Sequence, residues 1–181
     1  MKRSVILSIA IACLMVTFSV PASAGWNPDR IKKDMKTSQE IIAEFRTKDA
    51  GIKRFFDMAH GYAVFPKITK GGLVIGAAHG SGVVYEKGVV VGSATLSQGT
   101  VGFQLGFQTY SEIIFFKQKA ALDRLKDGKL KFSGQASAIA AEEGASAEVD
   151  YEEGVAVFTL PRAGLMAEAS IGGQHFSFES K

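Results

Sequence analysis

Residues 62–116 consist of short β-branched and aromatic runs separated by glycine, a pattern that commits this part of the chain to a β-sheet. The segment VGFQLGFQT alternates glycine and glutamine with four apolar residues: Val101, Phe103, Leu105 and Phe107. A period of two is expected for a strand with one face buried and the other wet or tightly packed. We therefore predict that this strand buries its apolar face in the core.

The remaining periodicities define the other elements. Strand-like runs cover residues 62–66, 72–78, 82–86, 88–97, 100–110, 111–116, 129–140, 154–161, 164–173 and 174–179. Helical spacing covers residues 27–48, where Asn27 can cap and Pro28 suits the first turn, and residues 52–59 and 117–128. These patterns predict one α+β domain with a β-rich, mainly antiparallel core, sandwich or barrel-like, with N-terminal helices and one inserted helix.

The glycine-rich segment Gly61 to Gly82 does not have the spacing of a nucleotide-binding or catalytic loop. It lacks the two glycines followed by Lys and Ser or Thr that wrap a phosphate, and no helix follows it to receive a pyrophosphate. The glycines that flank Ser81 are one residue too close for a hydrolase elbow. We therefore interpret these glycines as hairpin, bulge and corner residues of a sheet.

Residues 1–24 have the three parts of a secretory signal: Lys2 and Arg3, a long apolar run, and ASA before Gly25. We expect a mature domain of residues 25–181 in the periplasm or cell envelope. An inner-membrane anchor is an alternative, but the apolar run is shorter than the ~20 residues of a typical span. A lipoprotein attached through Cys13 is a second, less favoured alternative.

Charge argues against nucleic acid as a partner. The formal net charge is +3, and residues 25–70 hold 10 basic and 6 acidic side chains, whereas residues 71–181 hold 9 and 12. A dedicated nucleic-acid binder is usually far more basic. The N-terminal part is therefore the cationic part of a nearly neutral protein.

No catalytic or metal-binding motif is evident, so we expect no enzymatic activity, no cofactor and no bound metal. The histidines, His60, His79 and His175, have no spacing that requires two of them to converge. Six acidic residues lie within residues 142–153, but they lack the ligand spacing of a calcium-binding loop. A solvated loop is the favoured interpretation of that cluster.

The order of the motifs resembles a known family. Short basic helices are followed by GYAVFPKITKGGLVIGAAHGSGVV, then GSATLSQGTVGFQLGFQTYSEIIFF, then KAALDRL and finally GLMAEASIGG. This series, over about residues 52–178, resembles the SYLF domain, a lipid-binding domain of eukaryotic actin-patch and phosphoinositide-binding proteins and of many exported bacterial proteins. The resemblance implies a β-rich α+β domain that associates with membrane lipid and has no known catalytic activity.

In eukaryotic members, lipid contact is attributed to a basic amphipathic N-terminal region. On this resemblance the lipid-binding residues are Lys53, Arg54, Lys67 and Lys70, with Phe55 and Phe56 beside them and Lys32, Lys33 and Lys36 as weaker candidates. An exported bacterial chain would meet anionic phospholipids such as phosphatidylglycerol, so actin binding and phosphoinositide specificity are not carried over. The alternative is that both phenylalanines pin their helix to the core while the charges stay solvated.

Two other functions stay open at this point. A small outer-membrane β-barrel would also show an export signal and alternating strands, although the charged helix at 117–128 disfavours it. An envelope hydrolase would require His79 or His175 to lie in a pocket with a carboxylate. The oligomeric state does not follow from the sequence.

Overall fold

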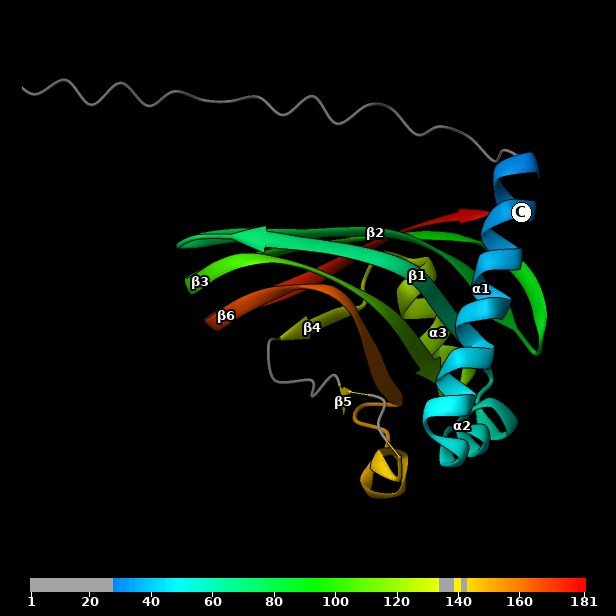
Figure 1. Ribbon diagram of the computed structural model, residues 1–181. Helices are drawn as coiled ribbons and strands as arrows, with labels where there is room; N and C mark the ends of the chain where they lie inside the picture. The colour runs from blue at the N-terminus through cyan, green and yellow to red at the C-terminus, as the bar shows by residue number, and fades with distance from the viewer. Residues whose placement is uncertain (1–27, 134–138, 141–142) are drawn as a thin grey trace, which may run out of the picture.

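The computed structural model describes residues 28–133, 139–140 and 143–181, which form a curved sheet flanked by helices (Figure 1). The predicted signal segment 1–24, with Cys13, lies outside the described residues. In chain order the elements are α1 (Pro28–Lys48), η1 (Ala50–Ile52), α2 (Lys53–Met58), β1 (Gly61–Gly72), β2 (Ile75–Glu86), β3 (Val89–Phe116), α3 (Lys119–Lys126), β4 (Lys131–Ser133), β5 (Ile139–Ala140), η2 (Ala145–Glu148) and β6 (Val155–Ser180).

The path of β3 determines the shape of the sheet. Residues 89–101 pair antiparallel with β2, and residues 106–116 pair antiparallel with β1. Because β1 and β2 are themselves antiparallel, β3 has to reverse its direction around the end of their hairpin. β6 pairs with β3 along nearly its whole length, so the two long strands form one bent ribbon around β1 and β2. Short β4 and β5 add to β6.

Three predicted strands at 88–97, 100–110 and 111–116 are therefore a single strand, and β6 likewise joins three predicted strands. Glycines allow the ribbon to bend without leaving the sheet. Gly102 and Gly106 in β3 have φ angles of 137° and 130°, and Gly164 in β6 has 91°. L-residues with a Cβ rarely adopt these angles, so the bend depends on glycine.

Two of the glycines between Gly61 and Gly82 have a different role from the predicted corners. Gly80 and Gly82 lie inside β2, opposite the bulge that β1 forms between Val64 and Lys67. A Cβ on Gly82 would come within 2.4 Å of the Val64 carbonyl oxygen. The prediction of a bulge is confirmed, but these two glycines permit close approach of two strands and do not turn the chain.

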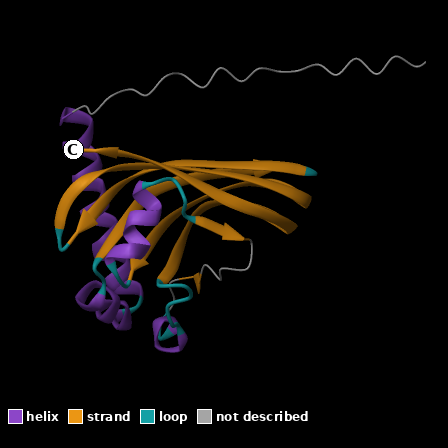
Figure 2. Cartoon of the chain, turned by 180° about the vertical axis from the view of Figure 1, so that it is seen from behind, coloured by secondary structure: helices purple, strands orange, loops and turns teal. Residues whose placement is uncertain are grey.

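Helices cover the two faces of the sheet at the same end (Figure 2). On one face, α1 and α2 bury Ile41, Phe45 and Phe55 against β-strand residues such as Ile113 and Phe158. On the other face, α3 packs its apolar side on a second cluster, with Leu122 and Leu125 fully buried. The α+β class with a β-rich antiparallel core is thus confirmed, and α1, α2 and α3 lie within two residues of the predicted bounds.

Candidate lipid-binding surface

The basic residues of α2 are occupied by contacts within the protein. Lys53 forms an ion pair with Asp57, one helical turn away. Arg54 Nη2 donates hydrogen bonds to the carbonyl oxygens of Ser146 and Val149, each at 2.6 Å. The guanidinium group therefore ties α2 to the chain around η2, a contact that sequence reasoning missed because the acceptors lie more than 90 residues away.

The two phenylalanines of α2 point into the structure. Phe55 is 2% exposed, and its ring centroid lies 4.9 Å from that of Phe158. Phe56 is partly buried and packs edge-on against Phe115 at 4.7 Å, with the Arg46 guanidinium over its ring. Burial of aromatic rings in such a cluster fixes the position of the helix. This geometry favours the interpretation that both rings pin α2 to the core.

The other predicted cations differ in exposure. Lys70 is 7% exposed in β1, whereas Lys67 is exposed in the same strand. On α1, Lys32, Lys33 and Lys36 are all exposed. Within the described part of the chain, no ion pair involves Lys67 or these three α1 lysines.

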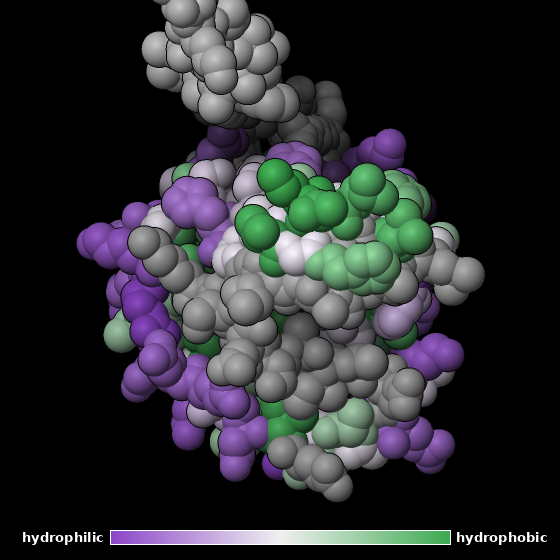
Figure 3. All heavy atoms as spheres, turned by 90° about the vertical axis from the view of Figure 1, so that its left-hand side faces the viewer, coloured by the Kyte–Doolittle hydropathy of each residue, from purple (hydrophilic) through white to green (hydrophobic). Residues whose placement is uncertain are grey.

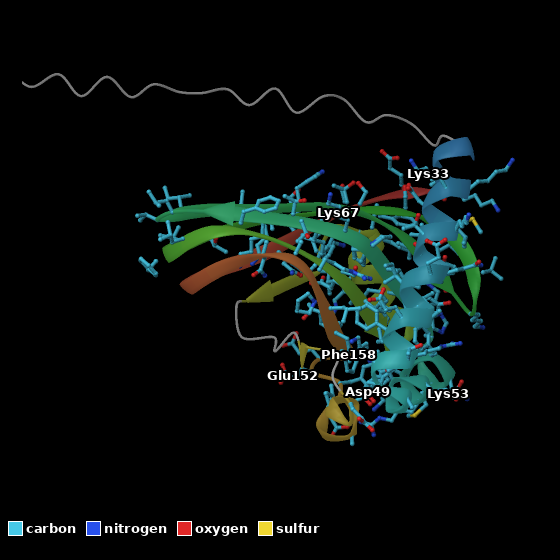
Figure 4. All side chains as sticks on the ribbon, viewed as in Figure 1. Lys33, Asp49, Lys53, Lys67, Glu152 and Phe158 are labelled. Carbon is cyan, nitrogen blue, oxygen red and sulfur yellow. The ribbon has the colours of Figure 1, made fainter. Side chains whose placement is uncertain are left out.

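The predicted site is therefore divided in space. Figure 4 shows Lys33 and Lys67 on the upper side of the molecule, with Lys67 between Lys33 and the free end of the sheet. Lys53 lies at the lower end, near Asp49. The structure thus places Lys33 and Lys67 on one side of the molecule, apart from Lys53.

At the end of the sheet away from the helices, a set of large apolar side chains is exposed, which we call the apolar tip. Its members are more than half exposed: Leu73, Val74, Ile75, Val101, Phe103, Leu105 and Phe107. Figure 3 shows apolar surface gathered on this face of the molecule. The prediction that residues 101–107 form a strand is confirmed, but the prediction that their apolar face is buried is wrong. The helices that cover this sheet face at Ile113 and Phe115 do not extend to the tip.

The backbone of the apolar tip is hydrogen-bonded. The loop between β1 and β2 is held to the bend of β3, since the Gly102 amide donates to the Val74 carbonyl at 2.9 Å. Beside it, Ile75 pairs with Val101, and Gly71 pairs with Phe107. Part of the backbone that carries the exposed apolar side chains is thus hydrogen-bonded within the sheet.

Titratable groups in the sheet have structural partners or are exposed. Glu86 Oε2 accepts from Lys126 Nζ at 2.7 Å, and its Oε1 lies 2.8 Å from His60 Nε2. His79 and His175 are exposed, and the sheet register places them on the two strands that flank Ser97 of β3.

In the described ranges, no three histidine, cysteine or acidic side chains are grouped so as to hold a metal ion. No described helix is both long and apolar enough to cross a bilayer.

The structure is a curved, helix-flanked sheet on which exposed lysines and exposed large apolar side chains lie at different places. Residues 97–181 match the family described as "Ysc84: Las17-binding protein actin regulator". This match covers slightly less than half of the chain, and it agrees with the resemblance to the SYLF domain that the motifs indicated. Members of this family are binding domains associated with lipid or actin.

A bacterial relative shares sequence with a larger part of the chain. Beta cell expansion factor A of Aeromonas veronii is 27% identical over 127 residues, which are 68% of this chain and 48% of that protein. The chain therefore spans about half the length of this curated relative.

Proposed function

We propose that this chain is a non-enzymatic protein of the bacterial envelope that docks peripherally on anionic phospholipid through Lys32, Lys33, Lys36 and Lys67. The observation that supports this proposal is that all four lysines are exposed without ion-pair partners among the described residues, and that Lys33 and Lys67 lie on the same side of the molecule. Lys53 and Arg54 are not part of this surface, because they are engaged with Asp57 and with the chain around η2.

The strength of such docking can be estimated from the charges. A lysine near an anionic membrane surface contributes about 1 kcal/mol. Four lysines would then contribute roughly 4 kcal/mol, which corresponds to a dissociation constant of about 1 mM. The attraction would be weak and sensitive to salt, because ions screen exposed charges beyond ~10 Å at 0.1 M.

Export through the predicted signal would bring the protein to an anionic bilayer. The membranes of the envelope would offer phosphatidylglycerol and cardiolipin as docking surfaces. Actin is absent from this compartment, so a lipid surface fits the proposed localisation better than the actin-related role named in the family description.

The test is cosedimentation with vesicles of phosphatidylglycerol and phosphatidylcholine, at low and high salt. Changing Lys32, Lys33, Lys36 and Lys67 to Gln should abolish the salt-sensitive part of binding. The matched control changes Lys87, Lys117, Lys119 and Lys129, which are exposed elsewhere on the surface, and should bind like the parent. Equal binding by both variants would remove the proposed lysines from the site.

A further inference from the structure

We propose that the apolar tip inserts into the acyl-chain region of a lipid bilayer. The tip anchors the protein in the membrane, whereas the lysines only attract the protein to the membrane surface. This inference rests on the proposed function, since it names a second contact with the same membrane. The observation that supports it is the set of exposed apolar side chains at the free end of the sheet. None of these residues was predicted from the sequence to contact lipid.

The exposure of the tip is unusual for a surface in water. Ile75 is 74% exposed, Val101 66% and Phe103 60%. Scattered apolar residues are normal on a protein surface, but large apolar side chains gathered on one surface mark an interaction site. The tip brings together two turning points of the chain, the β1–β2 loop and the bend of β3.

The chemistry of the tip matches hydrocarbon. No Asp, Glu, Lys or Arg occurs in residues 71–85 or 88–111, which supply all its exposed apolar side chains. In the adjoining bend of β6, Glu168 pairs with Gln104 of β3. A protein partner would be expected to meet a polar and charged rim around an apolar centre. The uncharged tip lacks such a rim along β2 and β3.

The backbone of the tip suits a water-free environment. An unpaired N–H or C=O group costs several kcal/mol in hydrocarbon, so irregular exposed loops are excluded from it. Here the bond from the Gly102 amide to Val74, together with the pairing of Ile75 with Val101, engages the backbone where the chain turns. These bonds reduce the number of backbone groups that insertion would leave unpaired in lipid.

The position of the cations complements the tip. Lys67 precedes Leu73 by six residues of extended chain, or about 20 Å at ~3.3 Å per residue. Interfacial segments bury their apolar side about 5–10 Å into the boundary between headgroups and acyl chains. With the tip at this depth, Lys67 stays on the water side within electrostatic range of the lipid phosphates. The apolar tip and Lys67 can thus contact one bilayer together.

The first experiment compares two sets of exposed apolar residues. In the tip variant, Leu73, Val74 and Phe103 are changed to Ser; in the control, Met58 and Val89, which are equally exposed at other places, are changed to Ser. All proteins are checked for an unchanged far-ultraviolet spectrum and denaturation midpoint. Binding to phosphatidylglycerol vesicles and the surface-pressure rise of a phosphatidylcholine monolayer are then measured.

We expect the tip variant to bind vesicles at least tenfold more weakly and to lose the monolayer pressure rise, while the control behaves like the parent. The Lys-to-Gln variant should lose affinity for phosphatidylglycerol and still penetrate a phosphatidylcholine monolayer. Parent-like penetration by the tip variant would overturn the insertion and leave the docking proposal standing. Failure of the parent to bind phosphatidylglycerol vesicles at low salt would instead overturn the docking proposal.

A second measurement reads the depth of the tip directly. Tryptophan is placed at Leu73 or, as a control, at Val89, and fluorescence quenching by lipids brominated along their acyl chains is compared with that of the parent. Quenching specific to position 73 supports insertion. Equal quenching at both positions contradicts insertion. Insertion is also contradicted if the parent is a dimer in sedimentation velocity and the tip variant is a monomer that binds vesicles like the parent, because the tip would then be a dimer interface.

Discussion

Asp49 and Ser146 are joined by a hydrogen bond across 97 residues of sequence, with the Ser146 amide 2.7 Å from Asp49 Oδ2. The other carboxylate oxygen accepts from the Gly51 amide at 2.9 Å and caps η1. Burial would raise the pKa of Asp49, but hydrogen bonds from Ser146, Gly51 and Gly144 outweigh it and lower the pKa. One carboxylate thus joins the turn before α2 to η2.

Replacing Asp49 by Ala should therefore destabilise the protein by about 2–3 kcal/mol, because charged hydrogen bonds are lost and buried amides lose their acceptor. Asp49→Asn should cost less, since an amide oxygen can still accept. Chemical denaturation at neutral pH measures both. The lowered pKa means that the stability from Asp49 is present above pH ~4 and lost as the pH falls below it.

Arg54 should behave as a structural residue and not as a lipid ligand. Arg54→Gln is expected to lower the free energy of unfolding by about 2 kcal/mol, because two carbonyl oxygens lose a charged donor. Arg54→Lys should restore little of this loss, since an ammonium group lacks the planar fork of the guanidinium. Thermal unfolding and vesicle binding are measured in parallel. A variant with parent-like stability and lost lipid binding would contradict this assignment.

Glu86 should make the protein sensitive to acid. Hydrogen bonds from Lys126 and His60 lower the pKa of Glu86 to about 2. The stability that this carboxylate contributes is complete above its unfolded pKa of about 4.5 and is lost as the pH falls towards 2. Because the side chain is 21% exposed, we expect Glu86→Gln to cost only about 1–2 kcal/mol at pH 7. The difference between parent and variant in denaturation midpoint should narrow between pH 4.5 and 2.

Glu112 should have the opposite pH dependence. Burial raises the pKa of Glu112 to about 7, and the hydrogen bond from Gln174 offsets this only in part. The folded state accommodates the neutral carboxyl of Glu112. The contribution of this group to the free energy of unfolding is therefore fully present below pH ~4.5 and is lost as the pH rises through 7. Glu112→Gln should remove this decline and be more stable than the parent at pH 8, by an amount of the order of 3 kcal/mol. Denaturation from pH 5 to 9 provides the measurement, and parallel profiles would contradict the prediction.

Gly82 should not tolerate a side chain. An alanine Cβ would meet the Val64 carbonyl oxygen at 2.4 Å and the Phe65 ring at 2.7 Å, and the backbone oxygen cannot move without disturbing β1. We expect Gly82→Ala to destabilise the protein by about 2 kcal/mol or more. Gly99→Ala, where nothing lies within 4 Å, is the matched control and should be nearly neutral.

Much of the fold follows from local pattern. Ile31 and Phe45 are buried on α1 as their helical spacing indicates, Met35 and Ile42 on the same pattern are partly buried, and Leu122 and Leu125 are buried on α3. These elements are predictable because a 3.6-residue period depends on near neighbours in sequence.

The joining of strands was not predictable, because a glycine that bends a strand looks like a glycine that ends one. Gly102 and Gly106 stand in a run that reads as a strand with turns at its borders, yet both lie inside β3. Their positive φ angles are a response to the β1–β2 hairpin that β3 surrounds. The sequence contains no local indication of that tertiary requirement.

The candidate site was predicted only in part. Alternation identified Val101 and Phe103 as one face of a strand, but it does not say whether anything covers that face. For the cations, sequence reasoning ranked Arg54 and Lys70 above the α1 lysines. In the structure Arg54 is hydrogen-bonded to two backbone carbonyls and Lys70 is buried, whereas Lys32, Lys33, Lys36 and Lys67 are exposed and have no ion-pair partner among the described residues. The acceptors of Arg54 come from a distant segment, so its structural use was hidden until the chain was folded.

The bent β3–β6 ribbon joins parts of the chain that lie far apart in sequence. A fragment beginning at residue 97, where the family match begins, would cut β3 in two and remove the hairpin around which the ribbon bends. Truncation within β6 would remove part of the strand that pairs with β3 along nearly its whole length. The ribbon can therefore be completed only after the last strand has been synthesised.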